Sequence, residues 1–127
     1  MSLISRRRKM AKINLADKFT KITEYWSPKI AGQLNGQYVK LAKFKGEFVW
    51  HHHQEDEFFL VIKGTLTIHL KDDDVTLHEG EFYIVPAGVE HLPVAIEEVH
   101  ALMIEPISPL NTGNVTNERT LETLDWI

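Results

Sequence analysis

The feature that most constrains the fold of this chain is a series of short apolar segments, each followed by residues typical of turns. Segments of about four to eight residues, rich in valine, isoleucine and aromatic residues and separated by glycine, proline or aspartate, indicate β-strands. About eight of them follow one another with little space for helix. They cover residues 37–44, 47–53, 57–63, 65–70, 74–78, 81–86, 91–96 and 99–105. The pattern predicts an all-β antiparallel sandwich or barrel.

Two other elements are expected at the ends of this series. Asn14 can cap a short helical turn that carries Phe19 and Ile22, and Pro28 ends this region. Residues 111–127 begin polar and become apolar at their end. We expect this C-terminal extension to pack back onto the barrel or against a partner subunit.

Length and charge limit what the chain can be. The 127 residues suffice for one domain, and no apolar run approaches the roughly 18 residues needed to span a membrane. Residues 1–9 hold four basic side chains, so the remaining chain has 10 basic against 18 acidic residues. Such an acidic body repels phosphate backbones, which excludes nucleic acid as a partner. We assign residues 1–10 to a basic leader or upstream extension, and residues 11–127 to a single domain.

The chain contains no cysteine. Disulfide bonds, thiolate metal sites and cysteine nucleophiles are therefore ruled out. This composition fits a reducing compartment, and we expect a cytoplasmic protein.

Three consecutive histidines and a nearby glutamate suggest a metal site. In an extended segment alternate side chains share a face, so His51 and His53 point one way and His52 points the other. Glu57 opens the next apolar segment, where it can face the same point. Acidic residues between them, Glu55 and Asp56, are interpreted as turn residues that could also orient a ligand imidazole.

A fourth ligand has to come from elsewhere in the chain. The candidates are His69, His78, His91 and His100. His91 is the best placed, because the Pro-Ala-Gly turn at 86–88 holds the chain rigid just before it.

These residues carry a strong resemblance to the cupin superfamily. Its first motif reads glycine, His-x-His, glutamate and glycine, and here these positions are Gly46, His51, His53, Glu57 and Gly64. The spacing departs from the usual pattern in one place, since four residues rather than five separate the first glycine from the first histidine.

The second cupin motif is present as well. It appears here as Gly80, Pro86, Gly88 and His91, with Ala95 where asparagine is usual. No ligand is lost by this departure, although hydrogen bonding around the ligands can change.

The resemblance implies a double-stranded β-helix, that is, a jelly-roll barrel, with a metal in its mouth. The implied ligands are His51, His53, Glu57 and His91. Three imidazoles and one carboxylate suit a single divalent transition metal, namely Fe, Mn, Ni, Co or Zn. Phe59 and Val61 share the face of Glu57 and are candidate substrate-binding residues or plain core.

Several activities are compatible with this fold. Outside the leader the only arginine is Arg119, and Lys40, Lys43 and Lys45 can act only as point charges, which disfavours a phosphosugar substrate. We see no acid–base pair for epimerisation. A metal-dependent dioxygenase or oxidase acting on a small molecule is therefore favoured. The alternatives are a non-catalytic sensor of a metal or small molecule, and a sugar isomerase or epimerase.

The segment 57–63 is apolar on both faces, because Phe58, Leu60 and Ile62 lie opposite Phe59 and Val61. A strand of this kind is buried on both sides. We therefore expect a homodimer.

Overall fold

The computed structural model describes residues 11–107, 113–118, 120, 121 and 123–127. The leader expected at 1–10 lies outside the described residues, and so does Arg119. The described chain forms one short helix, α2 (Leu15–Phe19), and seven strands. The strands are β1 (Lys29–Leu34), β2 (Gln37–Glu47), β3 (Glu57–Lys63), β4 (Leu66–Leu70), β5 (Asp74–Leu77), β6 (Phe82–Val85) and β7 (His91–Pro106). The all-β jelly-roll prediction is confirmed.

The N-terminal segment confirms the expected cap. The side chain of Asn14 accepts a hydrogen bond from the backbone N–H of Asp17 at 3.1 Å, and the helix ends at Phe19.

No helix among the described residues is long and apolar enough to cross a membrane. Strand β1, which follows Pro28 directly, was not predicted. It lies at one edge of the sheet and pairs with β2.

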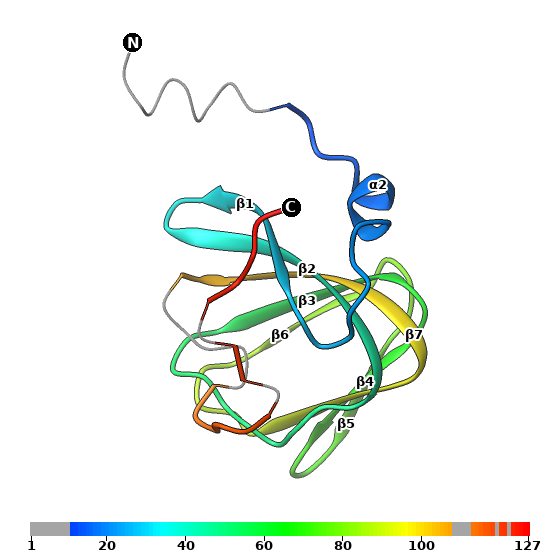
Figure 1. The fold of residues 1–127 in the computed structure, drawn as a ribbon. Coiled ribbons are helices and arrows are strands. Elements are labelled where there is room, and N and C mark those ends of the chain that lie inside the picture. The colour runs from blue at the N-terminus through cyan, green and yellow to red at the C-terminus, as the bar shows by residue number, and fades with distance from the viewer. Residues whose placement is uncertain (1–10, 108–112, 119, 122) are drawn as a thin grey trace.

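Strand β7 is the centre of the sheet (Figure 1). The strand order is β1-β2-β7-β3-β6, and β4 pairs with both β5 and β7. The first residues of β7, 91–94, pair with β4, whereas residues 100–104 pair with β3. Strand β2 pairs along most of its length with the opposite edge of β7. One long bent strand thus joins both halves of the roll.

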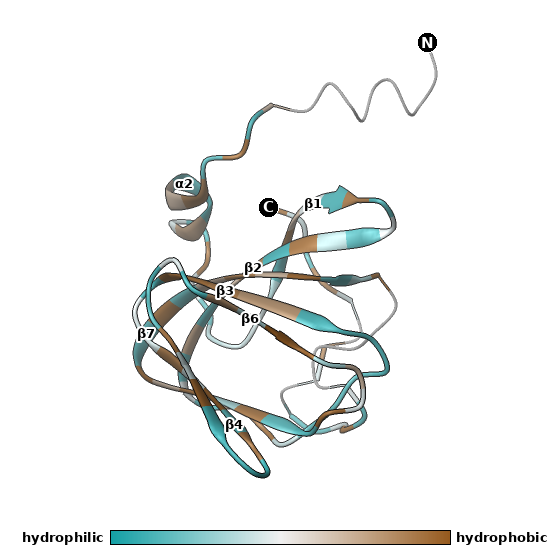
Figure 2. Cartoon of the chain, turned by 180° about the vertical axis from the view of Figure 1, so that it is seen from behind, coloured by the Kyte–Doolittle hydropathy of each residue, from teal (hydrophilic) through white to brown (hydrophobic). Residues whose placement is uncertain are grey.

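Apolar residues recur along the strands (Figure 2), and the buried ones form two clusters, one inside the roll and one on its outer side. The interior is filled by side chains such as Phe44, Phe59, Val61 and Ala101. A smaller cluster lies outside, where α2 and β1 cover the sheet; it contains Phe19, Ile22, Ala31 and Leu41.

Two of the expected strands differ from the structure. Residues 91–96 and 99–105 belong to one strand, because the exposed residues between them contain no turn former and the ladder continues past a bulge in β2. Residues 47–53 are not a continuous strand. Glu47 is the last residue of β2 and pairs with Val94 on β7, and beyond it only His51 makes a bridge, to His91.

Candidate metal centre

The two halves of the site are joined by backbone hydrogen bonds. The N–H of His51 donates to the carbonyl of His91 at 3.1 Å, and the N–H of His91 donates back at 2.9 Å. The alternation expected for this segment is preserved although it is not a strand. His51 and His53 are buried, whereas His52 is half-buried and points the other way. Nδ1 of His52 lies 3.3 Å from Oε1 of Glu90.

The four predicted ligands converge. Each of His51, His53, Glu57 and His91 offers one ligand atom, and all four atoms lie within 4.8 Å of one another. Glu57 is the first residue of β3, where it is paired with Val85 on β6. All four side chains are buried, so the site is shielded from bulk water.

Backbone carbonyl groups fix the orientation of two imidazole rings. Nδ1 of His51 lies 2.8 Å from the carbonyl oxygen of Val49, and Nδ1 of His91 lies 2.9 Å from that of Val89. A carbonyl oxygen only accepts, so each Nδ1 carries the proton and donates it. In the neutral ring this leaves a lone pair on Nε2, the atom that binds a metal.

The contacts around Glu57 fit a cation at the centre of the cluster. Its Oε1 lies 3.1 Å from Nε2 of His91, and its Oε2 lies 3.3 Å from Nε2 of His53. In a metal complex, bonds of about 2.1 Å at right angles place neighbouring ligand atoms about 3 Å apart. Among the described residues neither ring nitrogen of His53 has a hydrogen-bond partner of good geometry, although both are buried. A divalent transition metal would give Nε2 of His53 the partner that it lacks.

The protonation states of His51 and Glu57 suit metal binding. Burial, followed by the neighbouring charge of His91, lowers the pKa of His51 to about 4, so this ring is neutral at physiological pH. Burial opposes ionisation of Glu57, but the close contacts with the imidazoles of His53 and His91 outweigh it and hold the pKa of this carboxyl well below its usual range. Burial also opposes a charge on His53, yet the adjacent carboxylate of Glu57 prevails and raises the pKa of this ring, so a metal would compete with a proton at His53.

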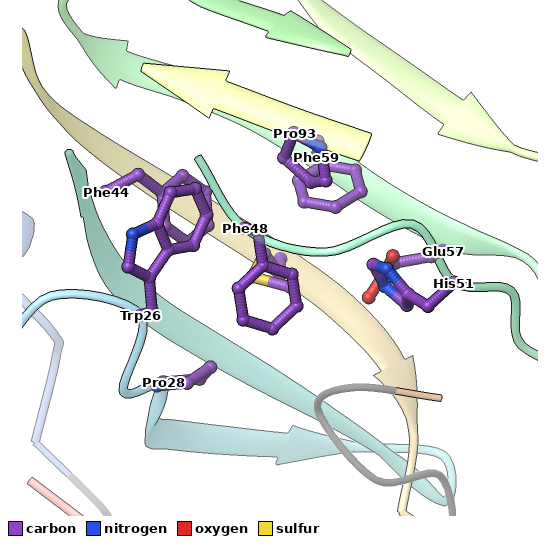
Figure 3. Close-up of a pocket in the computed structure, with 9 residues that line it drawn as sticks. Trp26, Pro28, Phe44, Phe48, His51, Glu57, Phe59 and Pro93 are labelled. Carbon is purple, nitrogen blue, oxygen red and sulfur yellow. The ribbon is translucent and has the colours of Figure 1, made fainter. Parts of the chain in front are cut away.

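A small apolar cavity adjoins the cluster (Figure 3). It is lined by Trp26, Pro28, Phe44, Phe48, His51, Glu57, Phe59, Pro93 and Met103. Figure 3 shows Trp26 and Phe44 toward one end, His51 and Glu57 together at the other, and Phe48 between them. The free space is about 20 Å³, which is about what one water molecule needs.

The predicted pocket residues have different places. Phe59 lines the cavity, whereas Val61 is buried in the core and is not among the lining residues. Sequence reasoning missed Trp26, Phe48 and Met103, which reach the cavity from three separate parts of the chain. Their spacing in the sequence gives no signal of this.

The other histidines lie away from the cluster. Nδ1 of His69 lies 2.6 Å from Oδ1 of Asp74, and Nε2 of His100 lies 2.7 Å from Oε2 of Glu98. His78 is exposed. Asp56 was interpreted as a turn residue that could also orient a ligand imidazole. Its carboxylate accepts a hydrogen bond from the N–H of Ala87, which ties the two motif loops together.

A buried ion pair next to the cluster was not predicted. Nζ of Lys40 lies 2.5 Å from Oε1 of Glu105, and both side chains are almost fully buried. Burial and then the negative charge of Glu57 raise the pKa of Glu105 to about 8, while Lys40 opposes this rise. The short contact is nonetheless that of a charge-assisted hydrogen bond, so the pair would be ionised once a cation balances the charge of Glu57.

The C-terminal extension packs back on the site, as expected. The side-chain oxygen of Asn114 accepts a hydrogen bond from the N–H of His52 at 2.8 Å, and the N–H of Asn114 donates to the carbonyl of His52 at 3.1 Å. Gly113 has a positive φ of 58°, and a Cβ on it would lie 2.1 Å from the oxygen of His52. Only glycine fits this close approach to the histidine segment.

Comparisons with known proteins agree with this geometry. A solved cupin-2 domain-containing protein from Shewanella frigidimarina NCIMB 400 is 47% identical, with a TM-score of 0.73 over 74% of this chain and 93% of that one. The uncharacterised protein YdbB of Bacillus subtilis (strain 168) is 39% identical over 61 residues, which are 46% of this chain and 54% of that protein. A 3-hydroxyanthranilate 3,4-dioxygenase from Meyerozyma guilliermondii is 34% identical over 64 residues, or 47% of this chain and 38% of that enzyme.

These matches cover about half the length of the first curated relative and less of the second. The model of the cupin domain family matches residues 37–106, which include both motifs and all four clustered residues. The chain belongs to the cupin superfamily.

Proposed function

We propose that this cupin is a metal-dependent dioxygenase or oxidase that acts on a small molecule at a mononuclear site. His51, His53, Glu57 and His91 would hold one divalent transition metal, that is, Fe, Mn, Ni, Co or Zn. The observation that carries the proposal is the buried group of three imidazoles and one carboxylate, with ligand atoms within 4.8 Å of one another. Its oriented Nε2 atoms and ionised carboxylate suit such an ion.

The bound ion would supply activation of dioxygen or polarisation of a substrate oxygen. Groups of the protein itself have three tasks around the ion. The backbone carbonyls of Val49 and Val89 keep the ring protons of His51 and His91 on Nδ1. The apolar cavity wall excludes water from the reacting groups. Phe59 forms part of this wall and would contact the substrate.

The lining also bears on the class of substrate. No lysine or arginine is among the described residues that line the cavity, so nothing there would grip a phosphate. This favours oxidation of an uncharged or aromatic molecule over isomerisation of a sugar phosphate. The similarity to a 3-hydroxyanthranilate 3,4-dioxygenase supports the same direction.

The experiment begins with metal analysis of purified protein. The protein is then loaded with Fe(II) or Mn(II), and oxygen uptake is measured with a panel of aminophenols, catechols and enediols. The variant Glu57→Gln, which keeps the shape of the side chain but removes its charge, is the matched control. We expect substrate-dependent oxygen uptake that the variant lacks.

The alternatives give other results in the same series. Ligand-induced thermal shifts without any turnover would indicate a sensor. Incorporation of deuterium from solvent into a sugar would indicate an isomerase. No oxygen uptake with any compound of the panel would reject the dioxygenase proposal.

We further propose that the protein works as a cytoplasmic homodimer. On the outer face, Phe58 stacks on Phe82 with ring centroids 4.9 Å apart, and Phe82 and Ile84 on β6 are exposed. Ile62, by contrast, packs against the outer cluster under α2, so only part of the expected face is free. A second copy placed on β6 would cover the exposed apolar side chains.

A further inference from the structure

Three charged side chains form a row across the inner face of three neighbouring strands. Glu57 precedes Phe58 on β3 and Glu105 follows Ile104 on β7, and Phe58 is paired with Ile104. The two carboxylates therefore lie side by side at the end of this ladder. Lys40 on β2 contacts Glu105 from the side opposite to Glu57, with its Nζ 2.5 Å from Oε1 of Glu105. The order across the sheet is ammonium, carboxylate, and then the carboxylate of the metal cluster.

Stability does not explain this arrangement. Lys40 and Glu105 have only 1% and 2% of their side-chain surface exposed. Burying an ion pair costs desolvation energy, and apolar replacements are often as stable or more so. Two carboxylates side by side also repel each other. Oε2 of Glu105 is buried and has no hydrogen-bond partner among the described residues.

The orientation of the pair favours a cation at the cluster. Its negative end adjoins Glu57, and its positive end is one strand further away. The pair is neutral as a whole but acts as a dipole whose negative end faces the site. In a dry interior such a field is little screened.

We propose that Lys40 and Glu105 are positioning residues of the metal site: their ion pair sets the electrostatic field at Glu57 and so raises the affinity of the cluster for a divalent cation. This inference rests on the metal site of the proposed function, not on the reaction. The two residues act through Glu57 and do not themselves bind the ion.

The test is the affinity for Co(II) alone, measured by competition with a chelator, together with the visible absorption of the bound ion. Glu105→Gln leaves an unbalanced ammonium near the site, so we expect binding about tenfold weaker or more, the size typical for groups that support metal ligands. Lys40→Met leaves a second negative charge, so Co(II) should bind at least as tightly as to the wild type. The double variant, which has neither charge, should lie between Glu105→Gln and the wild type.

This opposite response separates the proposal from a structural role, which would weaken binding in both single variants. Glu98→Gln is the matched control, because it makes the same change on the outer, exposed part of β7 and should leave the affinity unchanged. If a single variant fails to fold, the double variant, which has no unpaired buried charge, must still bind Co(II) more weakly than the wild type.

The proposal is overturned if Glu105→Gln binds Co(II) as well as the wild type, or if Lys40→Met weakens binding as much as Glu105→Gln does. Wild-type protein that binds no metal would instead reject both this proposal and the proposed function. An unchanged Glu105→Gln affinity alongside tight wild-type binding would reject only the role of the pair.

Discussion

The burial of His51 predicts that the metal-free protein loses stability in mild acid. In the unfolded chain this imidazole titrates at its ordinary pKa of 6.5, whereas burial and His91 lower the pKa to about 4 in the folded chain. Between these two values the unfolded state binds more protons than the folded state. Stability therefore falls as the pH falls through this window, and rises as the pH rises.

The size of the effect follows from the same two values. The pKa of His51 is 6.5 in the unfolded chain and about 4 in the folded chain, and each unit of this difference corresponds to about 1.4 kcal/mol. The titration of His51 therefore lowers the free energy of unfolding by about 3 kcal/mol at pH 4 and below. His53 contributes with the opposite sign, because its raised pKa gives stability that is present below 6.5 and lost as the pH rises through the folded value. Glu57, whose pKa is lowered, loses its contribution only below its ordinary value of 4.5.

The assay is urea denaturation of chelator-treated protein at a series of pH values from 7 down to 4. The variant His51→Gln removes this titration but leaves His53 and Glu57, so the difference in unfolding free energy between wild type and variant isolates His51. We expect that difference to fall by about 3 kcal/mol across the window. A difference that stays constant with pH would refute the reasoning that burial keeps this imidazole neutral.

Three other perturbations test different parts of the structure. Gly113→Ala should lower both the melting temperature and the affinity for Co(II), because its Cβ would meet backbone oxygen at 2.1 Å; Gly36→Ala, also at positive φ but with nothing within 4 Å, should lower neither as much. Phe59→Ala should lower the free energy of unfolding in urea by about 3–5 kcal/mol, since the ring is 2% exposed; a smaller loss would mean that the cavity wall collapses around it. Phe82→Lys with Ile84→Lys should convert a dimer to a 14.7 kDa monomer in light scattering, and a wild-type monomer would contradict the assembly.

The sequence by itself determined the fold class and the four clustered residues. Strand alternation and turn residues are local properties, so most strands could be located from short stretches of sequence. The candidate ligands followed from their residue types and from the resemblance to two cupin motifs, the first of them one residue short before His51, and the structure brings His51, His53, Glu57 and His91 together. The homodimer, the cytoplasmic location and the activity remain predictions.

Only the tertiary structure decided what surrounds the cluster. Lys40 and Glu105 are 65 residues apart in the chain, and only the register of β2, β7 and β3 makes them neighbours of Glu57. Gly113 and Trp26 reach the site from the two ends of the chain. Contacts between distant segments depend on strand pairing and on packing of the whole core, and neither leaves a pattern in a short stretch of sequence.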